Sequence, residues 1–362
     1  MSALKLYDTW FREIRKLWPT ERVTRLRNLT WMLVGMYLSR SVHLQEMAAK
    51  LPLEVRLTSI ARRFRRFLNN LAFDPRAWYA SCAQSLLAQA AATGSIRLIL
   101  DASKVGAGHR LLMVALAYRK RALPIAWTWV QGAQGLSSVQ QQLSLLRYVH
   151  TLVPAQANVQ VLGDGEFGRV PVAHQLNCWG WRYVLRLKGD LQVCISHTTL
   201  RWQSLADLVT QRDHIVWHPG SLVTIRHLFR AHVLCYWATG EPDPWLLMTN
   251  LPDPRQGLQA YRRRMWIEEM FGDWKGHGVD LETTHLRQAD RLSRLVFVVA
   301  LLYLWLVSRG SQTIKAGLRA WVDRRGRRDL SVFRVGLYVL DRLCALDRSF
   351  HMRLIPYFET VR

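Results

Sequence analysis

The pattern of apolar and polar positions divides the chain into three parts. Up to about residue 90, apolar side chains recur every three or four positions, as at Leu33, Met36 and Tyr37, which predicts helices. From residue 95 on, short and nearly continuous apolar runs are separated by turn residues, which predicts strands. Helical periodicity returns at Tyr261 and continues to the C-terminus. The pattern therefore indicates a mixed α/β protein with helical ends.

The middle of the chain predicts elements in the order βββ-α-β-α-β. Strands are expected at 96–100, 111–118, 122–130, 159–162 and 183–187, and helices at 136–149 and 170–179. Three successive strands with short links form an antiparallel meander, and in such a sheet the first and fourth strands can be neighbours. Residues 189–260 predict a strand-rich insertion, including a hairpin whose turn is Pro219-Gly220.

The net charge indicates what kind of molecule the protein binds. The chain has 50 Lys and Arg against 26 Asp and Glu, a net charge of +24, and these residues are spread along the sequence. A folded surface with this imbalance favours a polyanion, with nucleic acid ahead of an anionic membrane surface. We therefore expect nucleic acid as the partner and no membrane.

One predicted helix, residues 59–68, interleaves arginines with Phe64, Phe67 and Leu68. On a helix these apolar residues would face inward and the arginines would form an outer stripe. Such a stripe either follows DNA phosphates or is an ordinary solvated face, and the net charge favours DNA. The stripe consists of Arg62, Arg63, Arg65 and Arg66.

Several classes of protein are disfavoured. None of the five cysteines has a CxxC spacing, which argues against a disulfide framework or a zinc ribbon and favours the cytoplasm. The longest apolar run, Leu295 to Val307, is shorter than the roughly 20 residues of a bilayer span and predicts a buried helix. No GxxxxGK[ST] stretch is present, which argues against a nucleotide-driven motor.

Two carboxylates follow predicted strands. Asp101 comes after the first strand and Asp164 after the fourth, so neighbouring strands would bring them together. Two such groups repel, which raises the pKa of one of them, and a divalent cation between them would remove the conflict. Oxygen ligands indicate Mg²⁺. Taken singly, an Asp at a strand end is more commonly a helix cap or a turn residue.

A third group of residues shares one face of a predicted helix. Tyr261, Arg264 and Glu268 are spaced i, i+3 and i+7, and Lys275 follows after about four turns from Tyr261. The alternative is an amphipathic surface helix with an ordinary Arg–Glu pair four residues apart.

The same four residues match the pattern Y-(2)-R-(3)-E-(6)-K, and on this motif the chain resembles the insertion-sequence-four family of bacterial DDE transposases. The likeness covers roughly residues 95–310. It implies a ribonuclease-H-like fold, a mixed sheet flanked by helices with a β-rich insertion. It also implies that Asp101, Asp164 and Glu268 are the catalytic, metal-binding acids.

The resemblance further implies a reaction and its partners. Two Mg²⁺ ions, which Mn²⁺ can replace, would support cleavage at element ends and strand transfer into target DNA, in related enzymes through a hairpin. Tyr261, Arg264 and Lys275 would hold DNA phosphates beside the metals. The partner would be double-stranded DNA, both terminal inverted repeats and target, in a homodimeric synaptic complex in the bacterial cytoplasm. A flipped base would need an aromatic platform. The candidates are Trp202, Trp217, Trp237, Trp245 and Trp266.

Some features leave alternatives open. Glu166 and Glu269 are competing carboxylates, and Met265 stands directly after the motif Arg, where related transposases often have Trp. A protein of this fold could also bind DNA without chemistry, or cleave DNA with Mg²⁺ without strand transfer.

Five segments are expected along the chain. They are a basic helical DNA-binding domain (1–90), the first part of the catalytic core (91–188), the strand-rich insertion (189–260), the second part of the core with the motif helix (261–310) and a basic helical C-terminal region (311–362).

Overall fold

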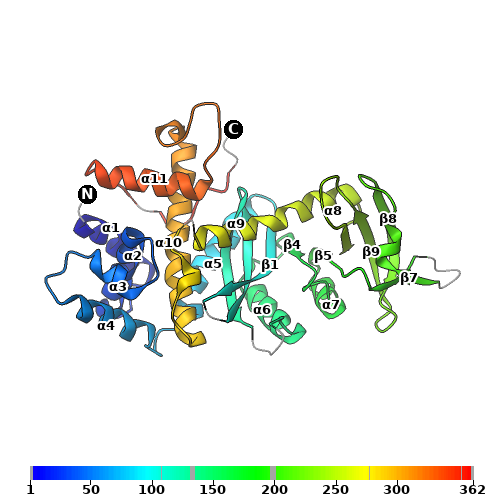
Figure 1. The fold of residues 1–362 in the computed structure, drawn as a ribbon, viewed down its shortest axis with the longest axis horizontal. Helices are drawn as coiled ribbons and strands as arrows, with labels where there is room; N and C mark the ends of the chain where they lie inside the picture. The colour runs from blue at the N-terminus through cyan, green and yellow to red at the C-terminus, as the bar shows by residue number, and fades with distance from the viewer. Residues whose placement is uncertain are drawn as a thin grey trace.

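A long mixed sheet crossed by helices organises the protein (Figure 1). The computed structural model describes residues 3–106, 108–130, 135–195, 201–276, 278–351 and 353–359. Ten strands form one sheet in the order β3-β2-β1-β4-β5-β10-β9-β8-β6-β7. The strands are β1 (Ile96–Val105), β2 (His109–Tyr118), β3 (Arg121–Trp129), β4 (Val159–Gly163), β5 (Arg182–Arg186), β6 (Gln192–Cys194), β7 (Trp202–Ser204), β8 (Ile215–Val223), β9 (Phe229–Tyr236) and β10 (Trp245–Thr249).

The core half of the sheet has the predicted topology. β1, β2 and β3 form an antiparallel meander, β4 lies parallel to β1, and β5 lies parallel to β4. The helices α6 (Val139–Leu152) and α7 (Val170–Cys178) connect β3 to β4 and β4 to β5. This arrangement confirms the predicted fold class, a ribonuclease-H-like mixed sheet flanked by helices.

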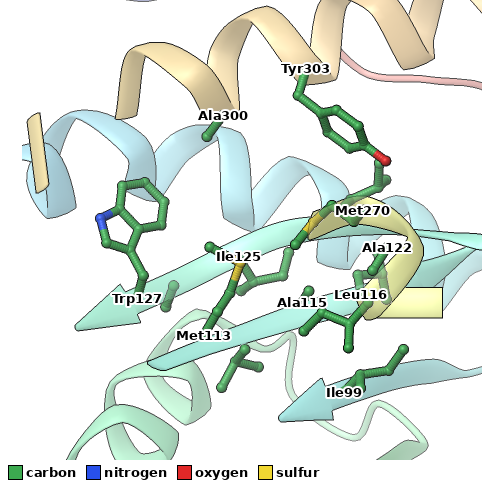
Figure 2. Close-up of a cluster of buried hydrophobic side chains, with 14 of the residues drawn as sticks. Ile99, Met113, Ala115, Leu116, Ala122, Ile125, Trp127, Met270, Ala300 and Tyr303 are labelled. Atoms are coloured by element: carbon green, nitrogen blue, oxygen red, sulfur yellow. The ribbon is translucent and has the colours of Figure 1, made fainter. Parts of the chain in front are cut away.

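Apolar side chains fill the space between this sheet and its covering helices. Figure 2 shows Met113 of β2 and Ile125 and Trp127 of β3 beneath α9 (Met265–Trp274) and α10 (Ala289–Lys315). Met270 of α9 and Tyr303 of α10 point into the same cluster, and both are buried. This packing attaches α9 to the sheet and thereby fixes the helix that carries Glu268.

Five helices precede the sheet, namely α1 (Ala3–Leu17), α2 (Val23–Ser39), α3 (Leu44–Ala49), α4 (Leu57–Leu68) and α5 (Pro75–Ala92). Asp74 caps α5 by accepting the backbone N–H of Arg76 at 2.9 Å, with Pro75 in the first turn. The buried Arg294 of α10 donates to the carbonyls of Leu68 and Phe73, at 3.1 and 3.0 Å. These bonds join the end of α4 and the following turn to the core.

The insertion differs from the sequence prediction in one respect. Pro219 and Gly220 do not form a hairpin turn but lie within the continuous strand β8, where the register against β9 shifts between His218 and Ser221. A bulge accommodates a proline because it needs no N–H at that position, and Gly220 has a φ of +68°. The hairpin turn follows β8 instead, at residues 224–228. Through the pairing of β10 with β5, the insertion extends the core sheet.

The helices after the insertion also shift two expected boundaries. The helical region expected from Tyr261 begins earlier, with α8 (Pro254–Tyr261), and is followed by the 3-10 turn η2 (Arg262–Arg264). α10 continues without a break past residue 310, so the expected boundary there falls inside a helix. α10 is long and apolar enough to span a membrane, but 89% of its most apolar stretch is buried within the protein. The remaining elements are η1 (Leu205–Leu208), η3 (Leu281–Thr283), η4 (Arg319–Trp321) and α11 (Val332–Ala345).

Two glycines allow α10 and α11 to pack with their backbones in contact. A Cβ added to Gly310 would lie 1.8 Å from the carbonyl oxygen of Val332, and one added to Gly336 would lie 1.8 Å from that of Leu306. We expect Gly310→Ala to lower the free energy of unfolding by about 1–3 kcal/mol, because the helices must separate to admit a methyl group. Urea unfolding measures this change.

The matched control is Gly276→Ala, because a Cβ at Gly276 would meet no atom within 4 Å. Equal urea midpoints for Gly310→Ala and the unmodified protein would show that α10 and α11 do not need this close contact.

Candidate active site

Asp101 and Asp164 lie side by side where two parallel strands separate. Leu100 of β1 pairs with Gly163, the last residue of β4, so the two aspartates occupy the next position on each chain. Asp101 was expected at the end of its strand, but β1 continues to Val105 because β2 pairs with that stretch, Asp101 lying opposite Met113. Asp101 is therefore held by a hairpin, and Asp164 by the loop that follows β4.

Burial strongly affects both carboxylates. Asp101 is only 7% exposed, and burial, followed by the charge of Asp164, raises its pKa to about 7. The backbone N–H of Ala102 donates to its Oδ1 at 2.7 Å and partly offsets this rise. Burial also raises the pKa of Asp164, against the opposing effects of a hydrogen bond from the Glu166 N–H and of Arg264. The pair is thus short of positive charge.

Arg264 links Glu268 to the aspartates. Glu268 lies in the first turn of α9, and its Oε1 is 2.7 Å from Nη1 of Arg264. The same Nη1 is 3.8 Å from Oδ2 of Asp101. Asp101 and Glu268 therefore flank one guanidinium, whose charge also lowers the pKa of Asp164 and whose Nε is buried and makes no hydrogen bond.

The motif residues do not share one regular helix. Tyr261 ends α8, Arg264 lies in the 3-10 turn, and Lys275 follows the last residue of α9. The helix ends there because the chain turns back through Gly278, where a Cβ would lie 1.9 Å from the carbonyl oxygen of Asp273. Nζ of Lys275 pairs with Oε1 of Glu282 at 3.1 Å, whereas Tyr261 is buried. Tyr261 and Arg264 thus lie beside the acids, and Lys275 lies at the other end of α9.

The two competing carboxylates have other partners. Glu166 is buried and pairs with Arg110, and it also accepts the backbone N–H and the hydroxyl of Ser137. Glu269 pairs with Arg121 of β3 at 2.9 Å. Each is thus paired with a different arginine from Arg264, which joins Asp101 and Glu268.

The acids fit a divalent cation in their chemistry. They offer only oxygen ligands, and the buried Asp101 and half-buried Asp164 gain from any positive charge placed beside them. Within the described residues, however, no three His, Cys, Asp or Glu side chains converge closely enough to hold an ion. Glu268 could join the aspartates at a cation only after its ion pair with Arg264 opens.

Trp245 is the candidate tryptophan that contacts the motif. Its ring meets the ring of Tyr261 edge to face, with centroids 5.1 Å apart. The other candidates have different neighbours. Arg212 lies over Trp237 at 4.3 Å, Trp217 contacts His232, Trp266 faces Arg263 at 6.0 Å, and Trp202 begins β7.

The arginine stripe lies on α4, well away from the acids. All four of its arginines are exposed, while Phe64, Phe67 and Leu68 of the same helix are buried, as the sequence predicts. None of the four pairs with a carboxylate in the described part of the chain. In Figure 1, α4 and the sheet lie on opposite sides of α10. The acids and the stripe are thus two separate regions.

Comparison with known proteins supports the sequence resemblance at the level of a broad family. The sequence model described as "Transposase DDE domain" matches residues 103–305, more than half of the chain. The chain belongs to the transposase DDE-domain family. This DDE transposase has its aspartate of β1 two positions before the matched range, which includes Asp164, Glu268 and the insertion.

One solved structure is also similar to this transposase. It is described as the piggyBac transposase synaptic complex with hairpin DNA, with a TM-score of 0.43 and 11% sequence identity. The match covers 93% of this chain and 76% of that one. No curated protein sequence matches this transposase significantly.

Sequence reasoning did not identify the surroundings of Glu166. Arg110, which directly precedes the apolar run of the second strand, and Ser137, which precedes the capping residue Ser138 of α6, both bind its carboxylate. The capping box of Ser138 and Gln141 is a sequence signal that places a helix start here. It does not reveal that a loop from another strand docks beside it.

Proposed function

We propose that this DDE transposase cleaves DNA at the ends of a mobile element and joins those ends to target DNA, in the manner of the insertion-sequence-four family. The observation that carries the proposal is the meeting of Asp101 and Asp164 on neighbouring parallel strands, with Glu268 linked to them through Arg264. Acids grouped beside one guanidinium suit a site that must bind metal ions and a phosphodiester together.

The three acids would hold the metal ions, two Mg²⁺ that Mn²⁺ can replace. When bound, such ions activate a hydroxyl nucleophile and stabilise the leaving oxygen at a phosphodiester. The chain itself supplies the fixed positions. Two acids come from adjacent strands, and the third comes from a helix that the apolar core holds against those strands. Water attack would release a 3′-hydroxyl, which would then attack the target or the opposite strand.

Arg264 has a second role in this proposal. A guanidinium can bind two phosphate oxygens at once, and Arg264 already lies between the acids at the place where a phosphodiester would sit. We infer that it leaves Glu268 for a DNA phosphate when DNA and metal bind. Tyr261 and Trp245 form an adjoining aromatic wall, and Trp245 is the candidate platform for a flipped base.

DNA binding would extend from the acids to the arginine stripe of α4, and two copies would bring two ends together. We expect affinity for element-end DNA to fall steeply with salt, with a slope of about −0.9 on log–log axes for each phosphate neutralised. The double variant Arg62→Gln and Arg66→Gln should reduce the magnitude of that slope by about 2. Fluorescence anisotropy over a series of salt concentrations measures both quantities.

The control is the double variant Arg325→Gln and Arg328→Gln, which removes the same charge from two exposed arginines in the segment between α10 and α11. A flat salt profile for the unmodified protein, or an equal change in slope for both variants, would contradict a DNA surface on α4.

One assay tests the reaction itself. Purified protein is incubated with element-end DNA, a target plasmid and Mg²⁺, and the products are separated on denaturing gels. Joined strands support a transposase reaction. Cleavage without joining would instead support a nuclease, and binding without cleavage a DNA-binding protein on the same fold.

A further inference from the structure

We propose that Glu166 is a positioning residue, whose buried carboxylate anchors the loop that carries Asp164. The inference rests on the proposed function, because it assigns Asp164 to the metal site. Glu166 itself is placed outside that site. Its role is to fix where the Asp164 carboxylate points.

The first step is the set of contacts that Glu166 makes. Its side chain is 5% exposed, and its Oε2 accepts from Nη2 of Arg110 on β2 at 2.5 Å. Its Oε1 accepts the backbone N–H of Ser137 at 2.6 Å and also the Ser137 hydroxyl. The carboxylate therefore joins a core strand to the start of α6, and both of its oxygens are satisfied.

The second step connects these contacts to Asp164. The backbone N–H of Glu166 donates to Oδ1 of Asp164 at 2.9 Å, so the place of residue 166 sets the direction of that carboxylate. The N–H of Phe167 donates to the carbonyl of Asp164 at 3.0 Å, which closes a tight turn. A shift of Glu166 would therefore move or release the oxygen that it holds.

The third step is that the loop is fixed at both ends. After Glu166, Gly168 packs so closely on β5 that a Cβ would lie 1.9 Å from the carbonyl oxygen of Arg186. Nε2 of Gln142, on α6, donates to Oγ of Ser137 at 2.9 Å and thus supports the anchor from behind. Close packing thus fixes the loop where it approaches β5, and the contacts of the Glu166 carboxylate fix its middle.

The fourth step concerns charge. Burying a carboxylate is costly unless it is paired and hydrogen-bonded, and a neutral side chain could fill the same space at lower cost. Only an ionised carboxylate can accept from a guanidinium, an N–H and a hydroxyl together, because an amide offers one acceptor oxygen. The anion therefore specifies one loop position, which suits a loop that must place a metal ligand.

The experiment compares Glu166→Gln with Asp273→Asn. Asp273 is a matched control, since it is also buried and paired with an arginine, Arg121, at 2.7 Å. It lies near the C-terminal end of α9, whereas Glu268 lies in the first turn of that helix. Two quantities are measured. Hydrogen exchange of residues 164–168 is followed without metal, and Mn²⁺ affinity is determined by electron paramagnetic resonance without DNA.

We expect Glu166→Gln to speed exchange in this loop and to weaken Mn²⁺ binding about tenfold, the range seen when partners of metal ligands are removed. Asp273→Asn should change neither. Unchanged loop exchange, faster exchange with unchanged Mn²⁺ affinity, or equal effects in both variants would overturn the positioning role. If Glu166→Gln fails to fold, Ser137→Ala, which removes one donor to the carboxylate, is measured in the same way.

The experiment tests the positioning role of Glu166 independently of the proposed metal-dependent function. If the unmodified protein binds no Mn²⁺, the proposed metal-dependent function is wrong. The exchange comparison then still decides whether Glu166 holds the Asp164 loop.

Discussion

Asp101→Asn, Asp164→Asn and Glu268→Gln should each reduce strand cleavage at least about 1000-fold, equivalent to about 4 kcal/mol of transition-state stabilisation. Each substitution removes one anionic ligand from the place where the three acids meet Arg264, with almost no change in side-chain volume. Single-turnover cleavage of labelled element-end DNA with Mg²⁺ gives the rates.

DNA affinity should remain within a fewfold in these variants, because the substitutions remove negative charge and leave the basic surface in place. This separates a loss of chemistry from a loss of binding. The neutral variants should also keep their fold, since replacing Asp101, whose burial raises its pKa to about 7, with Asn removes a buried charge.

Glu269→Gln is the matched control for Glu268→Gln. The two residues are adjacent on α9, but Glu269 pairs with Arg121 of β3 and not with Arg264. It should retain cleavage within about twofold, as is usual for a partly exposed ion pair. Full activity in any of the three acid variants, or equal loss in Glu269→Gln, would show that the acids are misassigned.

The sequence predicts the core of this protein well because its strands are buried on both faces. Runs such as Leu111 to Tyr118 are apolar throughout, and the structure has a strand at each predicted run of the core. Their order along the chain allows β1 and β4 to be neighbours, and the structure pairs them. The position of Asp101 and Asp164 followed from that topology.

Local signals failed where pairing with distant residues decides the structure. Pro219-Gly220 is an ordinary turn signal, but β9 pairs along both sides of it, and the chain forms a bulge instead of a turn. The end of α9 before Lys275 likewise depends on the close approach of Gly278 to Asp273. Neither contact is visible in the spacing of apolar residues.

The motif helix shows how two interpretations of one pattern can hold together. The spacing of Arg264 and Glu268 predicts either a DNA-binding motif or an ordinary Arg–Glu pair, and the structure contains the pair at 2.7 Å. The same arginine lies 3.8 Å from Asp101, which no helical spacing could reveal. Its position among the acids follows from the packing of α9 on the sheet.

This position of Arg264 leads to opposite effects of one substitution. Arg264→Gln should raise the Mn²⁺ affinity of the DNA-free protein about tenfold, because a nearby positive charge of this kind is worth on the order of 1 kcal/mol or more. The change frees Glu268 from its ion pair and removes a cation beside Asp101. Electron paramagnetic resonance titration with Mn²⁺ measures the affinity.

The same variant should cleave DNA about 100-fold more slowly at saturating Mn²⁺, the loss expected when one preorganised donor to a developing charge is removed. Tighter metal binding with slower cleavage distinguishes a guanidinium that alternates between acids and phosphate from one that only stabilises the fold. A purely structural arginine would lose both properties together.

Arg263→Gln is the control for these measurements. Arg263 is the neighbouring residue, donates to the carbonyl of Gln259 at 3.2 Å, and lies over Trp266 instead of pairing with the acids. We expect its Mn²⁺ affinity to match that of the unmodified protein. If Arg264→Gln binds Mn²⁺ no more tightly than Arg263→Gln does, the guanidinium does not compete with metal for Glu268, and its place among the acids in the free protein has no bearing on metal binding.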